Sequence, residues 1–276
     1  MRFTKMHGIG NDYVYINGFV ETVDEPEKLA LKISDRHFGV GSDGLILVLP
    51  SQVADLKMQM FNADGSEAEM CGNGSRCVGK FAFDKELIKK TEFTLETKAG
   101  IKYLKILAGD LKKRKVQVDI GEPILDPAQI PVRINQRPVL NYPILIDDTT
   151  WNITCVSMGN PHAVVITQNI EKLDLPTLGP KFENHQLFPN RINTEFIEVI
   201  TRSLIKMRVW ERGSAETLAC GTGACASVVA TILNGLCDRQ VVVKLIGGDL
   251  EVYWSAEDNH IYMTGDAVTV FEGEYL

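Results

Sequence analysis

Runs of apolar residues divide this chain into many short strands separated by polar turns. In the first half, strand patterns fall at residues 3–6, 13–18, 45–49, 56–61, 93–97, 101–107 and 115–120. In the second half they fall at 153–157, 163–167, 194–199, 205–210, 241–245, 250–254, 261–264 and 268–272. These short alternating or apolar runs, bounded by turn residues, are typical of β-sheet.

Three segments have a helical pattern instead. The first covers residues 26–38, begins with Pro and is expected to end at Gly39. The second follows Cys71, and the third, at 224–233, is small or apolar on nearly every side. A helix of that kind must be buried all round. A curved mixed or antiparallel sheet wrapped around one central helix in each half would bury both, which predicts an α+β fold.

The two halves repeat one another. Cys71-Gly72-Asn73-Gly74 and Cys220-Gly221-Thr222-Gly223 lie 149 residues apart. The same offset relates Asn11 to Asn160, Asn62 to Glu211, and the strand patterns at 45–48 and 194–197. One offset shared by four landmarks predicts an internal duplication and two pseudo-symmetric halves. We expect an N-terminal half at 1–121, joined by the C-terminal strand 267–276, a C-terminal half at 122–266, and an active site in the cleft between them.

The composition and net charge argue against nucleic acid and membranes as binding partners. Hydrophobic residues make up 45% of 276, enough for a large core, and 29 basic against 36 acidic residues give a net charge of −7. Nucleic acid or an anionic membrane would require clustered positive charge, so neither is expected as a partner. No apolar run approaches about 18 residues and no signal core is seen. We therefore expect a cytoplasmic enzyme whose six cysteines stay reduced.

Cys71 and Cys220 are the strongest candidates for chemistry. Each precedes Gly-X-Gly and then a helix, so its sulfur is expected at a helix N-terminus. There the helix dipole and the N–H groups favour an anion, either a thiolate or a substrate carboxylate. Two such thiols on opposite sides of one carbon could remove a proton from one face and return one to the other.

Other readings of the cysteines fit less well. The spacings Cys71-x5-Cys77 and Cys220-x4-Cys225 lack a Cys-x2-Cys pair, and no nearby His completes a zinc site, so no metal is expected. The glycine-rich turns lack the Gly-Lys-Ser/Thr ending of a phosphate-binding loop. A cysteine hydrolase would not explain the second thiol.

Specific motifs then identify a family. The chain contains Asn62-Ala63-Asp64-Gly65-Ser66 followed by Cys71-Gly72-Asn73-Gly74-Ser75-Arg76, the opening His7-Gly8-Ile9-Gly10-Asn11-Asp12, the block Ser157-Met158-Gly159-Asn160-Pro161-His162, and Ala219-Cys220-Gly221-Thr222-Gly223-Ala224-Cys225. In their order along the chain, and over its whole length, they resemble the diaminopimelate epimerase family. Related proline-racemase-like enzymes usually carry His after the first Cys-Gly, where this chain has Asn73.

The resemblance implies a pyridoxal-independent epimerase that needs no cofactor. Such an enzyme interconverts LL- and meso-2,6-diaminopimelate in lysine and peptidoglycan precursor synthesis, commonly as a homodimer. It implies that Cys71 and Cys220 are the acid/base pair, with His162 and Glu211 tuning the thiols. It further implies substrate binding by the backbone N–H groups of Gly72, Asn73, Gly221 and Thr222 and by the side chains of Asn11, Asn62, Asn160, Asn193, Glu211 and Arg212.

Two alternatives and one departure stay open. The chain could be another two-cysteine racemase, although Glu211-Arg212 favours a substrate with a second charged end. It could also be a binding protein without catalysis, which would not need both thiols. Some members of the family carry Gln at the position of Gly44, where it contacts substrate, and Gly44 cannot supply that contact.

Overall fold

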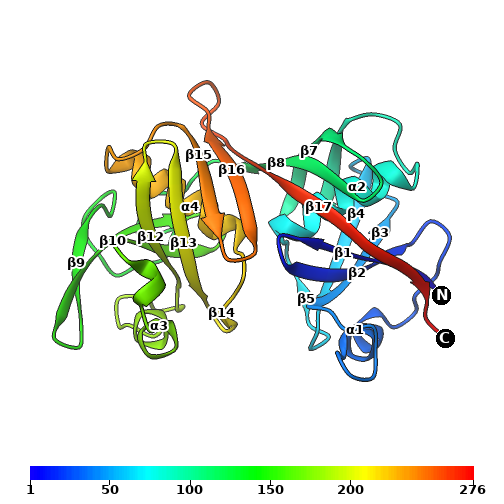
Figure 1. Cartoon of the computed structure of the whole chain (residues 1–276), viewed down its shortest axis with the longest axis horizontal. Coiled ribbons are helices and arrows are strands. Elements are labelled where there is room, and N and C mark those ends of the chain that lie inside the picture. The colour runs from blue at the N-terminus through cyan, green and yellow to red at the C-terminus, as the bar shows by residue number, and fades with distance from the viewer. The chain divides into compact units, whose positions relative to one another are not determined.

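The computed structural model describes residues 1–276 and divides them into two compact units (Figure 1). Unit 1 comprises Met1–Asp119 together with Thr264–Leu276, and unit 2 comprises Ile120–Met263. Strands predominate throughout, and they are accompanied by four α-helices and a short 3-10 helix at Ile170–Lys172. No helix is long and apolar enough to cross a membrane.

Unit 1 is built from a sheet with both antiparallel and parallel pairs. Its strands are β1 (Arg2–Gly8), β2 (Asn11–Asn17), β3 (Gly44–Leu49), β4 (Leu56–Asn62), β5 (Glu67–Ala68), β6 (Glu92–Thr97), β7 (Gly100–Gly109) and β8 (Lys113–Gly121), with β17 (Ile261–Glu274) returning from the C-terminus. Neighbours β2 and β3 are parallel, as are β4 and β6, whereas β1 pairs antiparallel with both β2 and β17. The C-terminal strand thus completes the sheet beside the first strand.

From β10 onward unit 2 repeats the order of elements of unit 1, with the 3-10 helix added before α3. Its strands are β9 (Tyr142–Ile146), β10 (Thr149–Ser157), β11 (Pro161–Ile166), β12 (Asn193–Thr201), β13 (Leu204–Glu211), β14 (Ala215–Glu216), β15 (Gln240–Leu245) and β16 (Gly248–Trp254). The pairs β11–β12 and β13–β15 are parallel, and they correspond to β2–β3 and β4–β6 of unit 1.

Equivalent helices of the two units begin at the same offset in sequence. Helices α1 (Pro26–Ser34) and α3 (Leu175–Glu183) begin 149 residues apart (175 − 26), and so do α2 (Gly72–Asp84) and α4 (Gly221–Leu233) (221 − 72). Register agrees as well, because Tyr13 lies opposite Gly44 and His162 lies opposite Asn193. The offset read from the sequence therefore recurs in the elements and in their pairing.

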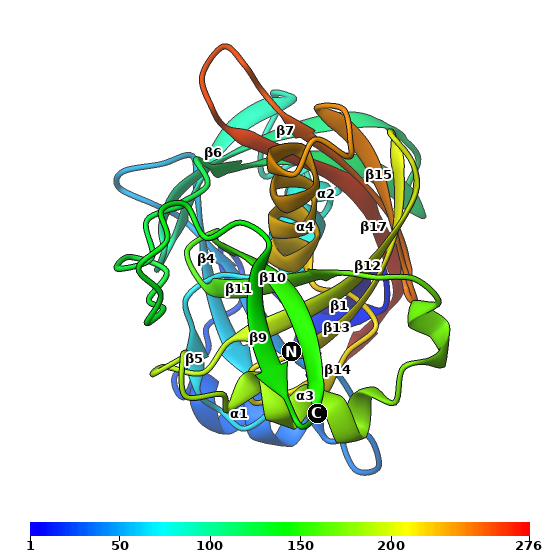
Figure 2. The same cartoon turned by 90° about the vertical axis from the view of Figure 1, so that its left-hand side faces the viewer.

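Each unit buries one long helix among its strands. Helix α2 packs on β1, β2, β3 and β7, and α4 packs on β10, β11, β12, β15 and β16 (Figures 1 and 2). Helix α4 is buried as its apolar sequence requires. Helix α2 also buries two charged residues, Arg76 and Lys80. These are hydrogen-bonded, Arg76 Nη2 to Asn73 Oδ1 at 2.9 Å and Lys80 to Asp84, as buried charges must be.

The first helix ends earlier than its pattern predicts. We expected it to run to residue 38 and to end at Gly39, but α1 stops at Ser34. The Asp35 carboxylate accepts hydrogen bonds from the backbone N–H groups of His37, at 2.7 Å, and Phe38, at 2.8 Å. Such a side-chain turn offers the backbone an alternative to continued helix, and it leaves the Phe38 side chain 93% exposed.

The α+β prediction holds only in a coarse form. Strands supply most of the ordered structure, and the helices are few and dispersed among them. The prediction of separate domains with an active site between them remains a prediction.

Candidate active site

Cys71 occupies the N-cap position of α2. Its backbone is extended, with φ −132° and ψ 121°, and its sulfur accepts a hydrogen bond from the N–H of Gly74 at 3.4 Å. The Asn11 Oδ1 atom lies 3.2 Å from the same sulfur and accepts a hydrogen bond from the thiol. A side chain expected to bind substrate therefore contacts a candidate catalytic thiol.

Cys220 occupies the same position on α4. Its φ and ψ are −121° and 111°, and its sulfur accepts from the N–H of Gly223, also at 3.4 Å. The Thr222 hydroxyl lies 3.6 Å from this sulfur. The two thiols thus cap two equivalent helices with nearly identical geometry, as the repeated motif predicts.

The N-terminal ends of α2 and α4 carry the backbone N–H groups that we expected to bind an anion. The first intrahelical hydrogen bonds run from Ser75 N to Cys71 O, at 2.8 Å, and from Ala224 N to Cys220 O, at 3.0 Å. Helix geometry gives the N–H groups of residues 72, 73, 221 and 222 no partner within the helix. Those four groups, with the positive end of the dipole, suit a carboxylate.

His162 is fully buried and held on both ring nitrogens. Its Nδ1 lies 2.7 Å from Glu195 Oε1, and its Nε2 lies 3.0 Å from Asn160 Oδ1. Glu195 is also fully buried, and its second oxygen makes no hydrogen bond. Burying a carboxylate costs free energy that its partners must offset, so Glu195 is a candidate functional residue.

Two carboxylates surround Cys220. Burial, followed by the charges of Glu211 and Glu195, raises the pKa of the Cys220 thiol well above its ordinary value. Burial likewise raises the pKa of Glu211, with a contribution from Glu195, against hydrogen bonds from the Thr217 hydroxyl and from Cys220. Cys220 is therefore held as a protonated thiol at neutral pH, and Glu211 forms a hydrogen bond with it.

Because the pKa of Glu211 is raised, we expect its neutral replacement to make the folded chain more stable and less active. When folding raises the pKa of a carboxyl group, the protonated group stabilises the folded state. This contribution is complete below the pKa of the unfolded chain, near 4.5, and it is lost as the pH rises through the pKa of the folded chain. Glu211→Gln is therefore expected to raise the free energy of unfolding at pH 7 by about 1 kcal/mol, a typical single-residue effect. Turnover should fall.

Urea unfolding at pH 4.5 and pH 7 measures this effect. The free energy of unfolding of Glu211→Gln should exceed that of the unmodified chain by more at pH 7 than at pH 4.5. Glu216→Gln provides the matched control, because Glu216 receives two hydrogen bonds from Arg208, at 2.7 and 3.0 Å, and its loss should be destabilising. A Glu211→Gln chain less stable than the unmodified chain at pH 7 would contradict the assignment.

The remaining predicted binding residues lie at strand ends. Asn193 links two of them, since its Nδ2 donates to Pro161 O and its Oδ1 accepts from the backbone N–H of Arg212, both at 2.9 Å. The Arg212 side chain is exposed and donates to Asn190 O at 3.1 Å. Asn62 donates to the Ser66 hydroxyl at 3.0 Å, within the turn before Cys71.

Buried Glu183 anchors the loop that carries Arg212. Its Oε1 accepts from Gly213 N at 2.9 Å and from Arg191 at 3.0 Å, and its Oε2 accepts from the Trp210 indole at 2.7 Å. The backbone at Arg212 is therefore fixed from both sides, by Asn193 and by Glu183.

Sequence reasoning missed Glu195 and Asp43. Asp43 Oδ2 accepts a hydrogen bond from Asn11 Nδ2 at 2.8 Å. The duplication contained a signal for both, because at an offset of 149 Glu195 corresponds to Ile46 and Asp43 to Ile192. An acid that replaces an apolar residue of the other half indicates a position with a role in only one half.

The backbone leaves no space for a side chain at Gly44. A Cβ there would lie 2.1 Å from Phe61 O and 2.8 Å from the Tyr13 ring. Gly44→Gln, which introduces the residue of some family members, is therefore expected to destabilise the chain by about 1–3 kcal/mol without improving substrate binding. Thermal unfolding measures the loss of stability, and KM measures substrate binding. Unchanged stability with a lower KM would contradict the prediction.

No group of three or more His, Cys, Asp or Glu side chains has an arrangement that could hold a metal ion. The chemistry available at these residues is proton transfer by thiols, beside helix N-termini that can bind an anion.

Comparison with known sequences gives strong matches over the whole chain. The profile of the family described as diaminopimelate epimerase matches residues 3–125 and 154–270. A diaminopimelate epimerase of Acetivibrio thermocellus is 58% identical over 274 residues, which covers 99% of this chain and 98% of that protein. One of Methanococcus maripaludis is 55% identical and covers 99% of both chains.

Solved structures share the fold at low sequence identity. A Bacillus anthracis phenazine biosynthesis protein of the PhzF family matches with a TM-score of 0.69 at 20% identity, covering 100% of this chain and 99% of the other. A probable proline racemase from Agrobacterium radiobacter matches with a TM-score of 0.68 at 17% identity, covering 100% and 92%. At these identities the likeness concerns the fold alone.

Proposed function

The chain belongs to the diaminopimelate epimerase family, and from this premise we propose that it interconverts LL- and meso-2,6-diaminopimelate with Cys71 and Cys220 as the acid/base pair. It is an isomerase of lysine biosynthesis, a route that also supplies peptidoglycan precursors. The observation that carries the mechanism is the pair of thiols, each capping a buried helix and each 3.4 Å from a glycine N–H.

The reaction exchanges one proton for another at the α-carbon. A thiolate takes the α-proton on one face, and the C–H electron pair remains on carbon. The opposite thiol then gives its proton to the other face and becomes a thiolate. Since the charge states of the two sulfurs are exchanged, the reverse reaction uses the same groups in opposite roles.

The two helix N-termini supply the stabilisation that a pyridoxal cofactor would give elsewhere. An amino-acid α-hydrogen is a very weak acid, so the carbanion requires electrostatic support. We assign the backbone N–H groups of Gly72, Asn73, Gly221 and Thr222 to the α-carboxylate, where fixed dipoles act strongly if water is excluded. The proposed mechanism requires one thiol on each face of the substrate's α-carbon.

The electrostatics of unit 2 suggest the starting role of one thiol. Because burial, Glu211 and Glu195 raise its pKa, Cys220 enters as the proton donor. His162 and Glu211 then tune this thiol, and Glu195 acts as a positioning residue that holds the His162 ring.

The polar residues at the strand ends are assigned to the rest of the substrate. Diaminopimelate has a second amino-acid end, for which Arg can bind the carboxylate and Glu or Asn oxygens can bind the ammonium group. The side chains assigned to this task are those of Asn11, Asn62, Asn160, Asn193, Glu211 and Arg212. We further propose two pseudo-symmetric domains, assembly as a homodimer and a cytoplasmic location.

A substrate panel tests this function. Incubation with LL-diaminopimelate, L-proline or L-lysine, followed by chiral chromatography, should yield a new isomer from diaminopimelate alone. The related fold of the probable proline racemase makes proline the informative competitor. Isomerisation of proline, with diaminopimelate unchanged, would replace the proposed substrate.

A further inference from the structure

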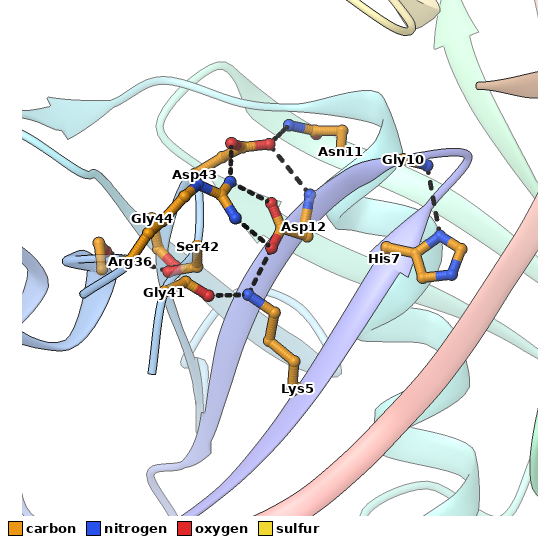
Figure 3. Close-up of polar contacts among 11 residues, drawn as sticks. Lys5, His7, Gly10, Asn11, Asp12, Arg36, Gly41, Ser42, Asp43 and Gly44 are labelled. Atoms are coloured by element: carbon orange, nitrogen blue, oxygen red, sulfur yellow. Dashed lines mark hydrogen bonds and ion pairs between the residues drawn. The ribbon is translucent and has the colours of Figure 1, made fainter. Parts of the chain in front are cut away.

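A chain of four charged side chains in unit 1 ends at Asn11 (Figure 3), whose carbonyl oxygen contacts Cys71. Lys5 pairs with Asp12 and donates to Gly41 O. Arg36 Nη2 lies 2.9 Å from Asp12 Oδ1 and 2.9 Å from Asp43 Oδ1. Burial alone would raise the pKa of Asp12, but hydrogen bonds from Arg36 and Lys5 outweigh it and lower the pKa. Asp12 is thus held as a carboxylate, and Asp43 is ion-paired with Arg36.

Asp43 fixes which way the Asn11 amide points. Its Oδ2 accepts hydrogen bonds from Asn11 Nδ2, at 2.8 Å, and from the backbone N–H of Asp12, at 3.1 Å. A carboxylate has no hydrogen to donate, so only the NH₂ group of the amide can face it. The carbonyl oxygen of Asn11 must then face the other way, and it lies 3.2 Å from Cys71 Sγ.

This orientation determines which group of the Asn11 amide forms a hydrogen bond with the Cys71 thiol. A carbonyl oxygen accepts a hydrogen bond from S–H, whereas the NH₂ group would donate to a thiolate and favour it. We propose that Asp43, held by Arg36, is a positioning residue that keeps the Asn11 carbonyl oxygen against Cys71, where it accepts a hydrogen bond from the thiol in the half of the catalytic cycle in which Cys71 carries the proton. The inference rests on the proposed use of Cys71 as acid and base.

The second unit arranges its equivalent asparagine differently. Asn160 corresponds to Asn11, and its carbonyl oxygen faces His162 Nε2 rather than a sulfur. The position equivalent to Asp43 is Ile192, which cannot orient an amide. The two thiols are therefore controlled by different devices, a buried Glu and His in unit 2 and an ion-paired Asp acting through Asn11 in unit 1. This difference makes Cys220 an internal reference for Cys71.

Asp43→Asn tests the proposal. The new amide can donate as well as accept, so Asn11 is able to turn its NH₂ group toward Cys71. With iodoacetamide at pH 7.5 and peptide mass spectrometry, alkylation of Cys71 relative to Cys220 should rise about threefold to tenfold. Turnover of diaminopimelate should fall about tenfold with KM changed by less than about threefold. Asp55→Asn, which removes a charge elsewhere in unit 1, should leave the ratio unchanged.

The alkylation ratio requires no substrate, so it tests the role of Asp43 even if diaminopimelate proves not to be the substrate. An unchanged ratio in folded Asp43→Asn, or a raised KM without a change in the ratio, would overturn the proposal. If Asp43→Asn does not fold, Arg36→Gln is measured instead, because the Arg36 side chain is 57% exposed. Its ratio should rise about twofold, and no rise would equally overturn the proposal.

Discussion

Serine in place of Cys71 or of Cys220 is expected to slow epimerisation at least about a hundredfold, the usual contribution of a positioned acid or base. An alcohol is a far weaker acid than a thiol, so Ser can neither form the anion that takes the α-proton nor readily replace the thiol as donor. The N-cap hydrogen bond to Gly74 or Gly223 should survive, because Ser is a favoured N-cap residue. Stability should therefore change little while turnover collapses.

Chiral chromatography of diaminopimelate turnover, together with thermal unfolding, measures both effects. Cys237→Ser is the matched control, since Cys237 is buried and its sulfur lies 3.9 Å from Thr201 O. It should retain turnover. Near-normal turnover in either Cys71→Ser or Cys220→Ser would remove the two-thiol mechanism.

Glu195→Gln is expected to lower turnover by about tenfold to a hundredfold, less than the loss of a general acid or base itself, because Glu195 acts through His162 and Cys220. Gln keeps the size of the side chain but removes the charge that holds the His162 ring and contributes to the raised pKa of Cys220. With that charge gone, the Cys220 thiol should ionise more readily and react faster with iodoacetamide. Cys71 should react as before.

The same alkylation assay measures this change. Asp43→Asn should raise the reactivity of Cys71 relative to Cys220, and Glu195→Gln should lower that ratio. A role of Glu195 in folding alone would reduce stability without shifting the ratio. An unchanged ratio together with unchanged turnover would show that Glu195 does not act on Cys220.

Much of the fold could be predicted because strand periodicity and the 149-residue repeat are local or self-comparing signals. The caps at Cys71 and Cys220 followed from Gly-X-Gly before a helix, and the structure has both. The early end of α1 was missed because the Asp35 side chain competes with the helix for backbone N–H groups. That competition depends on side-chain geometry rather than on apolar spacing.

The site was harder to complete than the fold. Glu195 lies within a predicted strand that also carries Glu198, and only the register of β11 against β12 brings it near His162. Asp43 acts through Asn11, so neither motif spacing nor composition connects it with a thiol. Asn11 itself was identified as a residue that binds substrate, which stays a prediction; its contact with Cys71 through the carbonyl oxygen was not foreseen.

The most direct test of the two-thiol mechanism is hydrogen exchange at the substrate's α-carbon. The reduced protein is incubated with LL-diaminopimelate in deuterated water, and the α-hydrogen signal is followed by NMR. We expect that signal to disappear as the meso isomer forms, because the proton returned to carbon comes from a thiol equilibrated with solvent. Persistence of the α-hydrogen, with no meso isomer and with both thiols titratable, would contradict the proposed substrate and its proton-transfer chemistry.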